Sequence, residues 1–310
     1  MDGAARLVVN VFVAGATGAI GVPTVKALIA AGHEVTGTTR AESKRAAIES
    51  LGARTVVMDA LVPDSVMRAV ERASPDVIVE LLTRLPDVPM RASDLEATNL
   101  LRTQGTANLI ATKGRAHLVA ESIAFFYGSS PQIFTENDEI PENMSPPMVQ
   151  PAATALRAHE DIVRAAGGVV LRFGLFYGPD TRSSRIMARR MRRRIGPVIA
   201  GGRGVLPWVH VEDAATAVVA ALRRAKPGEV YNVVDDEALT TRQTLDAFAE
   251  AVGAPRPWSV PKMMARLTAP YLAELMTWEV RVSNEKAKRE LDWSPIYATV
   301  REGARTLSGI

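Results

Sequence analysis

The stretch that most constrains the fold is Val8–Gly21, which reads VVNVFVAGATGAIG. Its first half is a nearly unbroken apolar run, which is typical of a parallel strand covered on both faces. Gly15, Gly18 and Gly21 follow at once. Glycine lets a backbone turn sharply, lets a phosphate approach bare N–H groups, and lets the next helix lie close to the sheet. Such a turn can also simply end a strand, but its strand-turn-helix setting favours binding of a dinucleotide pyrophosphate at the helix N-terminus.

The alternation of strand and helix continues along the chain. Pro23 and Gly32 bracket a first helix. A later and longer helix, capped by Ser93 and Glu96, is expected to run to about Lys113. Further strands are expected at residues 34–38, 55–58, 76–82, 118–120, 169–172 and 230–233. The predicted fold class is therefore α/β, with a doubly wound parallel sheet of the Rossmann type.

Two regions interrupt this alternation. Residues 175–205 are rich in arginine, and residues 234–310 are mostly helical in pattern. We expect these two regions to form a smaller, discontinuous substrate domain, because α/β sheets bind ligands beyond the carboxyl ends of their strands. Residues 1–174 and 206–233 would form the NADP-binding domain. The arginine run indicates either a solvated lid helix or a clamp for an acidic or phosphorylated substrate.

Composition excludes several classes of function. The chain has no cysteine, so thiolate metal sites and a cysteine nucleophile are excluded. Its four histidines lack ligand spacing, and we expect no metal site. With 37 basic and 34 acidic side chains, the net charge of +3 indicates neither nucleic acid nor a membrane as partner. Without an apolar run of membrane-spanning length or a signal-peptide pattern, the expected location is the cytoplasm.

The end of the second predicted strand bears on the choice of cofactor. A site that prefers NAD usually has an acid there, which accepts a hydrogen bond from the ribose 2′-hydroxyl. This sequence has Thr38, Thr39 and Arg40 instead, with Lys44 close behind. An arginine can hold a 2′-phosphate through two charge-assisted hydrogen bonds, which predicts NADPH, with NADH as a second acceptable cofactor. The alternative is that Arg40 merely ends the strand in solvent.

A series of motifs resembles the extended short-chain dehydrogenase/reductase family, of the NAD-dependent epimerase/dehydratase type, over essentially the whole chain. GATGAIG at 15–21 is similar to the cofactor turn of that family. Further matches are LRFGLFYGP at 171–179, WVHVEDAA at 208–215, YNVVDDE at 231–237 and SNEKAKRELDWSP at 283–295. With the strand-end residues, the resemblance implies cofactor contacts at Gly15, Thr17, Gly18, Ala19, Ile20, Gly21, Arg40, Lys44, Asp59, Ala60, Leu82 and Asn99.

The catalytic pair of the family is missing. Members use a tyrosine followed four residues later by a lysine, which lowers the pKa of the phenol so that it can protonate the nascent alkoxide. Glu160 resembles the acid that follows this lysine by four, so the expected positions of the pair are Ala152 and Leu156. Neither side chain can transfer a proton. No tyrosine anywhere in the chain is followed four residues later by lysine.

The pattern is similar to the tyrosine-less reductases of actinobacterial secondary metabolism. That resemblance implies an NADPH-dependent ketoreductase acting on a polycyclic aromatic ketone, because the cofactor carries the hydride and positioning survives loss of the pair. A non-catalytic NADP(H)-sensing protein and a sugar-nucleotide epimerase or dehydratase stay open as alternatives. Ser122 is the candidate catalytic residue, either orienting a carbonyl or making only a strand-end hydrogen bond. The expected substrate contacts are Ser122, Tyr127, Met187, Met191, Met264 and Trp278, although helix-spaced methionines also suit a plain core.

Overall fold

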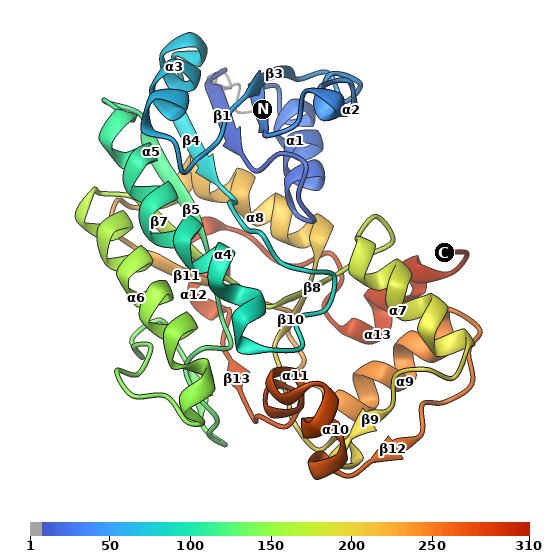
Figure 1. The fold of residues 1–310 in the computed structure, drawn as a ribbon. Coiled ribbons are helices and arrows are strands. Elements are labelled where there is room, and N and C mark those ends of the chain that lie inside the picture. The colour runs from blue at the N-terminus through green and yellow to red at the C-terminus, as the bar shows by residue number, and fades with distance from the viewer. Residues whose placement is uncertain (1–7) are drawn as a thin grey trace.

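A seven-stranded sheet forms the centre of the molecule in the computed structural model, which describes residues 8–310 (Figure 1). The strand order is β11-β7-β5-β4-β1-β2-β3, and every neighbouring pair is parallel. The predicted doubly wound parallel sheet is thus confirmed. Its strands are β1 (Asn10–Ala14), β2 (Glu34–Thr39), β3 (Arg54–Val57), β4 (Val77–Glu80), β5 (His117–Ile123), β7 (Val169–Phe173) and β11 (Val230–Val233).

Helices cover both faces of the sheet (Figure 1). On one face lie α1 (Gly21–Ala30), α2 (Arg45–Glu49), α8 (Val211–Arg224) and α12 (Glu285–Leu291). On the other lie α3 (Pro63–Ala73), α5 (Thr106–Thr112) and α6 (Gln150–Ala165). Val11 and Val79 face the first set of helices, whereas Phe12 and Ile78 face the second. Burial on both faces explains why most residues of β1, β4 and β7 are apolar.

Residues 92–112 form one continuous helical segment with a wider turn in its middle. It comprises η2 (Ala92–Leu95), α4 (Glu96–Leu100), the π-helical turn η3 (Leu101–Gly105) and α5. The predicted cap by Ser93 and Glu96 is wrong. Asp94 Oδ2 instead accepts the N–H groups of Met90 at 2.8 Å and Arg91 at 3.0 Å. Because these otherwise unpaired N–H groups are satisfied earlier in the chain, the segment begins at Ala92.

The rest of the chain lies beyond the carboxyl ends of the strands. Three small parallel sheets form there: β8 (Leu175–Tyr177) with β10 (Trp208–His210), β9 (Val198–Ile199) with β12 (Ser259–Val260), and β6 (Ile133–Phe134) with β13 (Arg281–Val282). The helices are α7 (Arg182–Arg192), α9 (Thr241–Ala251), α10 (Lys262–Thr268), α11 (Pro270–Leu275) and α13 (Val300–Gly303). None of the helices in residues 8–310 has the length and apolar character needed to span a bilayer.

One segment departs from the expected division into two domains. Ala287, Leu291 and Trp293 pack in the same core as β1 and α8, although the sequence assigned residues 234–310 to the substrate domain. Trp293 Nε1 also donates to the Asp213 carbonyl of α8 at 3.2 Å. This part of the C-terminal region therefore supports the central sheet. Elsewhere the division into two domains stays a prediction.

Candidate active site

The turn after β1 leaves its backbone open for a phosphate. Gly15 has a φ of +96°, and a Cβ there would lie 2.5 Å from the carbonyl oxygen of Leu81. A Cβ on Gly21 would lie 2.2 Å from the carbonyl oxygen of Gly15, so both positions require glycine. Gly18 and Ala19 are exposed, and α1 begins without a side-chain cap. An anion is favoured at such an uncapped helix N-terminus.

The backbone donors of this turn fit a pyrophosphate. Within residues 8–310, the N–H groups of Thr17, Ala19 and Ile20 have no hydrogen-bond partner. The Gly15 N–H, in contrast, donates to Thr38 Oγ1 at 3.1 Å, which ties the turn to the end of β2. The two predicted halves of the cofactor site, the glycine turn and the strand end, are therefore held together directly.

The end of β2 presents two unpaired cations. Arg40 and Lys44 are exposed, and neither forms an ion pair with a carboxylate in the described part of the chain. Their neighbour Arg45 is instead paired with Glu42 at 2.8 Å and with Glu49 at 3.6 Å. Arg40 and Lys44 thus suit a 2′-phosphate, because neither is held by a carboxylate among residues 8–310.

The other predicted cofactor contacts lie along the same edge of the sheet. Asp59 is exposed after β3, and its Oδ1 accepts the Leu61 N–H at 3.0 Å. Ala60 is buried and Leu82 is half-buried. Asn99 Oδ1 is buried with no hydrogen-bond partner among the described residues. A buried acceptor of this kind is normally satisfied, so Asn99 fits a hydroxyl donor of a bound ribose. The contacts themselves stay predictions.

Replacing Arg40 with alanine is expected to remove most of a preference for NADPH over NADH. A lost charge-assisted contact to the 2′-phosphate is worth roughly 1.5 to 3 kcal/mol, or about ten- to a hundredfold in Kd. The Kd values of both cofactors are measured by fluorescence titration. Arg45→Ala, which removes a paired arginine from the same segment, is the control and should retain the preference. Equal affinities for the two cofactors in the unmodified protein would contradict the assignment.

The positions at which the sequence predicts the catalytic pair lie in a closed apolar region. Ala152 and Leu156 are 2% and 0% exposed on α6, in a cluster with Phe126 and Trp278. The end of β5 beside them continues through Ile123 into three further apolar residues. Neither Ala152 nor Leu156 can give or take a proton.

Ser122 is bound into a buried ion-pair network. Its Oγ donates to Glu160 Oε1 at 2.5 Å. Arg172 holds the same carboxylate, with Nε 2.9 Å from Oε1 and Nη2 2.6 Å from Oε2. Arg172 Nη1 also donates to Tyr127 Oη at 2.7 Å, and Tyr127 Oη donates to Asn232 Oδ1 at 2.7 Å. The hydroxyl protons of Ser122 and Tyr127 are thus both used inside the network. This favours the interpretation in which Ser122 makes only a strand-end hydrogen bond.

Tyr127 has the wrong acidity for a catalytic phenol. Burial raises the pKa of Tyr127 to about 12, and the nearby Arg172 offsets this only in part. A general acid near neutral pH needs a lowered phenol pKa. Tyr127 therefore stays protonated at physiological pH, and its hydroxyl is held by hydrogen bonds with Arg172 and Asn232.

A second buried polar cluster, absent from the sequence-based prediction, lies behind the glycine turn. Glu80 Oε1 accepts the Leu82 N–H at 3.0 Å, while Glu80 Oε2 lies 3.6 Å from His159 Nε2. Arg102 Nη2 donates to Glu121 Oε1 at 3.3 Å. Apart from the half-buried Leu82, all these side chains are buried. The available signal was the presence of two glutamates in otherwise apolar strands, where a charge needs a partner.

The predicted substrate contacts do not gather in one place. Tyr127 and Trp278 are buried in one apolar cluster and Met191 in another, and the Tyr127 hydroxyl belongs to the ion-pair network. These three side chains cannot reach a ligand without repacking. Met187 on α7 is half-buried and Met264 on α10 is 61% exposed, so only these two methionines are open to a ligand as they stand.

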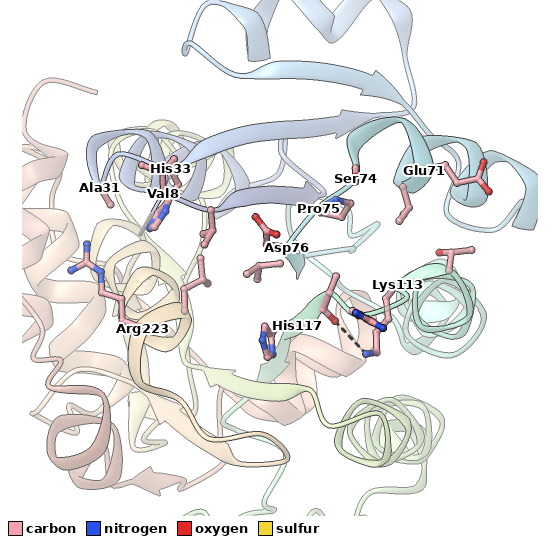
Figure 2. Close-up of a pocket in the computed structure, with 17 residues that line it drawn as sticks. Val8, Ala31, His33, Glu71, Ser74, Pro75, Asp76, Lys113, His117 and Arg223 are labelled. Carbon is pink, nitrogen blue, oxygen red and sulfur yellow. Dashed lines mark hydrogen bonds between the residues drawn. The ribbon is translucent and has the colours of Figure 1, made fainter. Parts of the chain in front are cut away.

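A cavity of about 1230 Å³ lies at the opposite end of the sheet (Figure 2). Its lining includes Val8, His33, Asp76 and His117, at or near the amino ends of the strands. None of the predicted cofactor or substrate residues lines it. Because α/β sheets bind their ligands at the carboxyl ends of the strands, we assign this cavity no part in the reaction.

The arginine-rich helix α7 and the two residues that follow it carry anchored and free side chains. Arg192 donates from Nε to the Val252 carbonyl at 3.0 Å and from Nη1 to the Ile310 carbonyl. Arg193 and Arg194 are exposed, without an ion pair to any carboxylate in residues 8–310.

Neutralising Arg193 and Arg194 to glutamine is expected to change turnover little and stability by less than about 0.5 kcal/mol, as for most surface substitutions. Arg192→Gln should destabilise the protein by about 1 kcal/mol, because two backbone carbonyls lose their donor. Urea unfolding and turnover on neutral and anionic substrates measure both effects. A large loss confined to anionic substrates in the Arg193/Arg194 variant would instead support a substrate clamp.

The parallel sheet, the glycine turn and the uncapped helix N-terminus define a dinucleotide-binding α/β protein. The sequence profile of the NAD dependent epimerase/dehydratase family matches residues 11–234, and the chain belongs to this family. Family membership confirms the predicted oxidoreductase class, of the extended short-chain dehydrogenase/reductase type, and the use of a nicotinamide cofactor.

Individual relatives agree with this assignment. The 3-diazoavenalumate denitrifying reductase of a Streptomyces species is 36% identical over 306 residues, which cover 95% of this chain and 98% of the relative. The solved structure of UDP-glucose 4-epimerase from Thermotoga maritima with UDP-glucose has a TM-score of 0.79 at 20% identity, covering 96% of this chain and 97% of that one. A human epimerase family protein with NADPH has a TM-score of 0.78 at 19% identity, covering 96% and 98%. The two solved structures bear on the fold alone.

Proposed function

We propose that this protein is a cytoplasmic NADPH-dependent reductase that delivers a hydride to a ketone of a large polycyclic aromatic metabolite. The observation that carries the proposal is the combination of two features. The cofactor turn has all its required glycines, and the positions predicted for the catalytic pair hold no acid. Gly15 and Gly21 have no room for a Cβ, whereas Ala152 and Leu156 occupy the positions that the sequence predicts for the proton-transferring pair. Hydride transfer needs the first feature and survives loss of the second.

The proton must come from outside the usual pair. Hydride addition turns the ketone into an alkoxide, and the hydroxyls of Ser122 and Tyr127 both donate into the ion-pair network instead. A phenol beside the ketone of the substrate would polarise the carbonyl through an internal hydrogen bond and stabilise the alkoxide as it forms, as an oxyanion hole does. This choice of acceptor follows the resemblance to the tyrosine-less reductases of simocyclinone-type angucycline biosynthesis.

A second acceptor class is favoured by the 36% identical relative, whose name describes reductive denitrification of a diazo compound. Hydride addition to the terminal nitrogen of an aryl diazonium ion gives an aryl diazene, which loses dinitrogen and keeps its hydrogen on the ring. No alkoxide forms in this sequence, so no acid is required. An acid-free site therefore suits an aryl diazonium ion as well as a phenol-bearing ketone.

The alternatives from the sequence are weaker. A sugar-nucleotide epimerase or dehydratase needs proton transfer at the sugar, and neither Ala152 nor Leu156 on α6 carries a titratable side chain. A sensor of NADP(H) would bind the cofactor without oxidising it.

A substrate panel separates these functions. NADPH oxidation is followed with polycyclic ketones that carry an adjacent phenol, with the same ketones lacking it, with an aryl diazonium salt and with UDP-glucose. We expect turnover of the phenol-bearing ketones and none of the sugar nucleotide. Tight NADPH binding without oxidation by any acceptor would contradict the proposal and favour the sensor.

A further inference from the structure

Glu80 ends β4 directly behind the cofactor turn. Its backbone lies opposite Ala14 in the register of β1 with β4, and the Leu81 N–H donates to the Ala14 carbonyl at 2.9 Å. The Leu81 carbonyl oxygen is the atom that a Cβ on Gly15 would approach to 2.5 Å. The segment Glu80–Leu82 therefore forms the surface against which the glycine turn is packed. A shift of this segment would change the shape of the phosphate site.

The Glu80 side chain folds back onto this same segment. One carboxyl oxygen, Oε1, accepts the Leu82 N–H at 3.0 Å and so fixes the chain just past β4. The other, Oε2, has no hydrogen-bond partner in residues 8–310 and faces His159 Nε2 at 3.6 Å. Glu80 is only 1% exposed. A negative charge in such a dry position is strongly unfavourable unless a positive group balances it.

The charges of the cluster balance only when it holds one extra proton. Arg102 is paired with Glu121, so their charges cancel. Glu80 and His159 remain, and together they are neutral when they share a single proton. The His159 ring is fixed, with Nε2 3.0 Å from the Glu121 carbonyl and Nδ1 3.1 Å from both the Arg102 carbonyl and Thr106 Oγ1. A proton on Glu80 with a neutral imidazole, or a carboxylate with an imidazolium, gives the same total charge.

Burial disfavours a charge on either group, so the neutral arrangement, with the proton on Glu80, is favoured at neutral pH. Burial, and then the neighbouring Glu121, raise the pKa of Glu80 to about 8. Burial, and then Arg102, lower the pKa of His159 to about 4. The other groups facing the cluster are Tyr271 on α11, whose pKa burial raises to about 12, and Glu160, which is paired with Arg172. Glu80 is thus the group of this cluster that loses its proton between neutral and alkaline pH, and the cluster then carries a net negative charge.

We propose that Glu80 is a positioning residue for the cofactor, whose protonated carboxyl keeps the Glu80–Leu82 segment packed behind the glycine turn. Loss of the proton leaves a second negative charge beside Glu121, in the dry interior and just behind the phosphate site. Like charges there repel each other and repel the pyrophosphate, so NADPH binding weakens on the alkaline side. The inference rests on the proposed NADPH site but not on the hydride acceptor.

The test is the pH dependence of NADPH binding by the unmodified protein and by Glu80→Gln. Glutamine keeps an oxygen for the Leu82 N–H but cannot ionise. Titration by fluorescence from about pH 6.5 to about pH 9.5 is expected to show a Kd that rises about tenfold or more above about pH 8 in the unmodified protein. The Kd of Glu80→Gln should match it at neutral pH and stay flat. Glu71→Gln, an exposed change on α3, should retain the alkaline rise.

Proton uptake gives a readout that a merely structural role would not move. Calorimetric titration with NADPH near about pH 8.5, in buffers of different ionisation enthalpy, should show a fraction of a proton taken up by the unmodified protein and none by Glu80→Gln. The 2′-phosphate is fully ionised there and contributes nothing. Glu121→Gln is a second variant, which should also abolish the alkaline rise because it leaves Arg102 free to balance an ionised Glu80.

Three results would overturn the inference. The first is a flat Kd in the unmodified protein, and the second is an alkaline rise that persists in both Glu80→Gln and Glu121→Gln. Either would leave the proposed function intact. The third is failure of NADPH to bind at any pH, which would overturn the proposed cofactor site and the inference together.

Discussion

Methylating the phenol beside the ketone of an accepted substrate is expected to lower kcat by more than about a hundredfold, a larger effect than any single side-chain change in the site. The methyl ether has no hydroxyl proton, so it can neither donate a hydrogen bond to the carbonyl nor stabilise the alkoxide. Ser122→Ala, Tyr127→Phe and His159→Ala should each lower kcat by less than about a hundredfold, the lower end of the contribution of a general acid. Their polar atoms are already held by Glu160, Asn232 and backbone carbonyls.

Matched substrates make this comparison sharp. A methoxy group of the same size on a ring position away from the ketone controls for bulk and should leave kcat nearly unchanged. Steady-state NADPH oxidation supplies kcat and KM for every pair of enzyme and substrate. If one of the three substitutions abolishes turnover while the methyl ether next to the ketone is still reduced well, the proton comes from the protein.

Arg172→Met is expected to destabilise the fold by about 3 to 5 kcal/mol, the usual cost of removing one partner of a buried ion pair. Arg172 makes three hydrogen bonds to Glu160 and Tyr127, and all three side chains are buried. Its removal leaves the Glu160 carboxylate with only the Ser122 hydroxyl as a donor. Urea unfolding with a fixed m-value measures the free energy of unfolding.

Two further variants identify the cause of that loss. Arg172→Met combined with Glu160→Met should recover much of the stability, because the uncompensated charge is then absent. The Arg182 side chain is 82% exposed and forms a surface ion pair with Asp87. Arg182→Met breaks this pair and should cost less than about 1 kcal/mol. Equal losses in Arg172→Met and Arg182→Met would show that the buried network does not support the fold as described.

The central sheet was predictable because its strands are buried on both faces. A parallel strand that is buried on both faces is mostly apolar, so VVNVFVA at the start and YNVV near the end stand out from the amphipathic helices between them. The N-terminus of the helical segment after β4 was not predictable. Ser93 and Asp94 both suit a cap, and only the path of the chain through Met90 and Arg91 decides that Asp94 accepts their N–H groups.

The cofactor turn was predictable for a local reason, whereas the buried clusters depend on contacts between distant segments. The backbone that crowds Gly15 and Gly21 lies within a few residues or just past the adjacent strand. The need for glycine at both positions can therefore be inferred from the local motif. The glutamate at the end of β4 stands out in an apolar run, but its neighbour His159 comes from α6. Met191 and Trp278 show the same limit, because helix-spaced apolar residues do not reveal whether they line a pocket or fill a core.

Transfer of deuterium from the nicotinamide C4 of labelled NADPH tests most directly whether this chain is a reductase. Each C4 epimer of deuterated NADPH is incubated with the protein and a phenol-bearing polycyclic ketone, and the product is examined by mass spectrometry. We expect deuterium at the carbinol carbon with one epimer and not with the other, because a fixed cofactor presents a single face to the acceptor. Tight binding of NADPH with no label in any product would contradict hydride transfer.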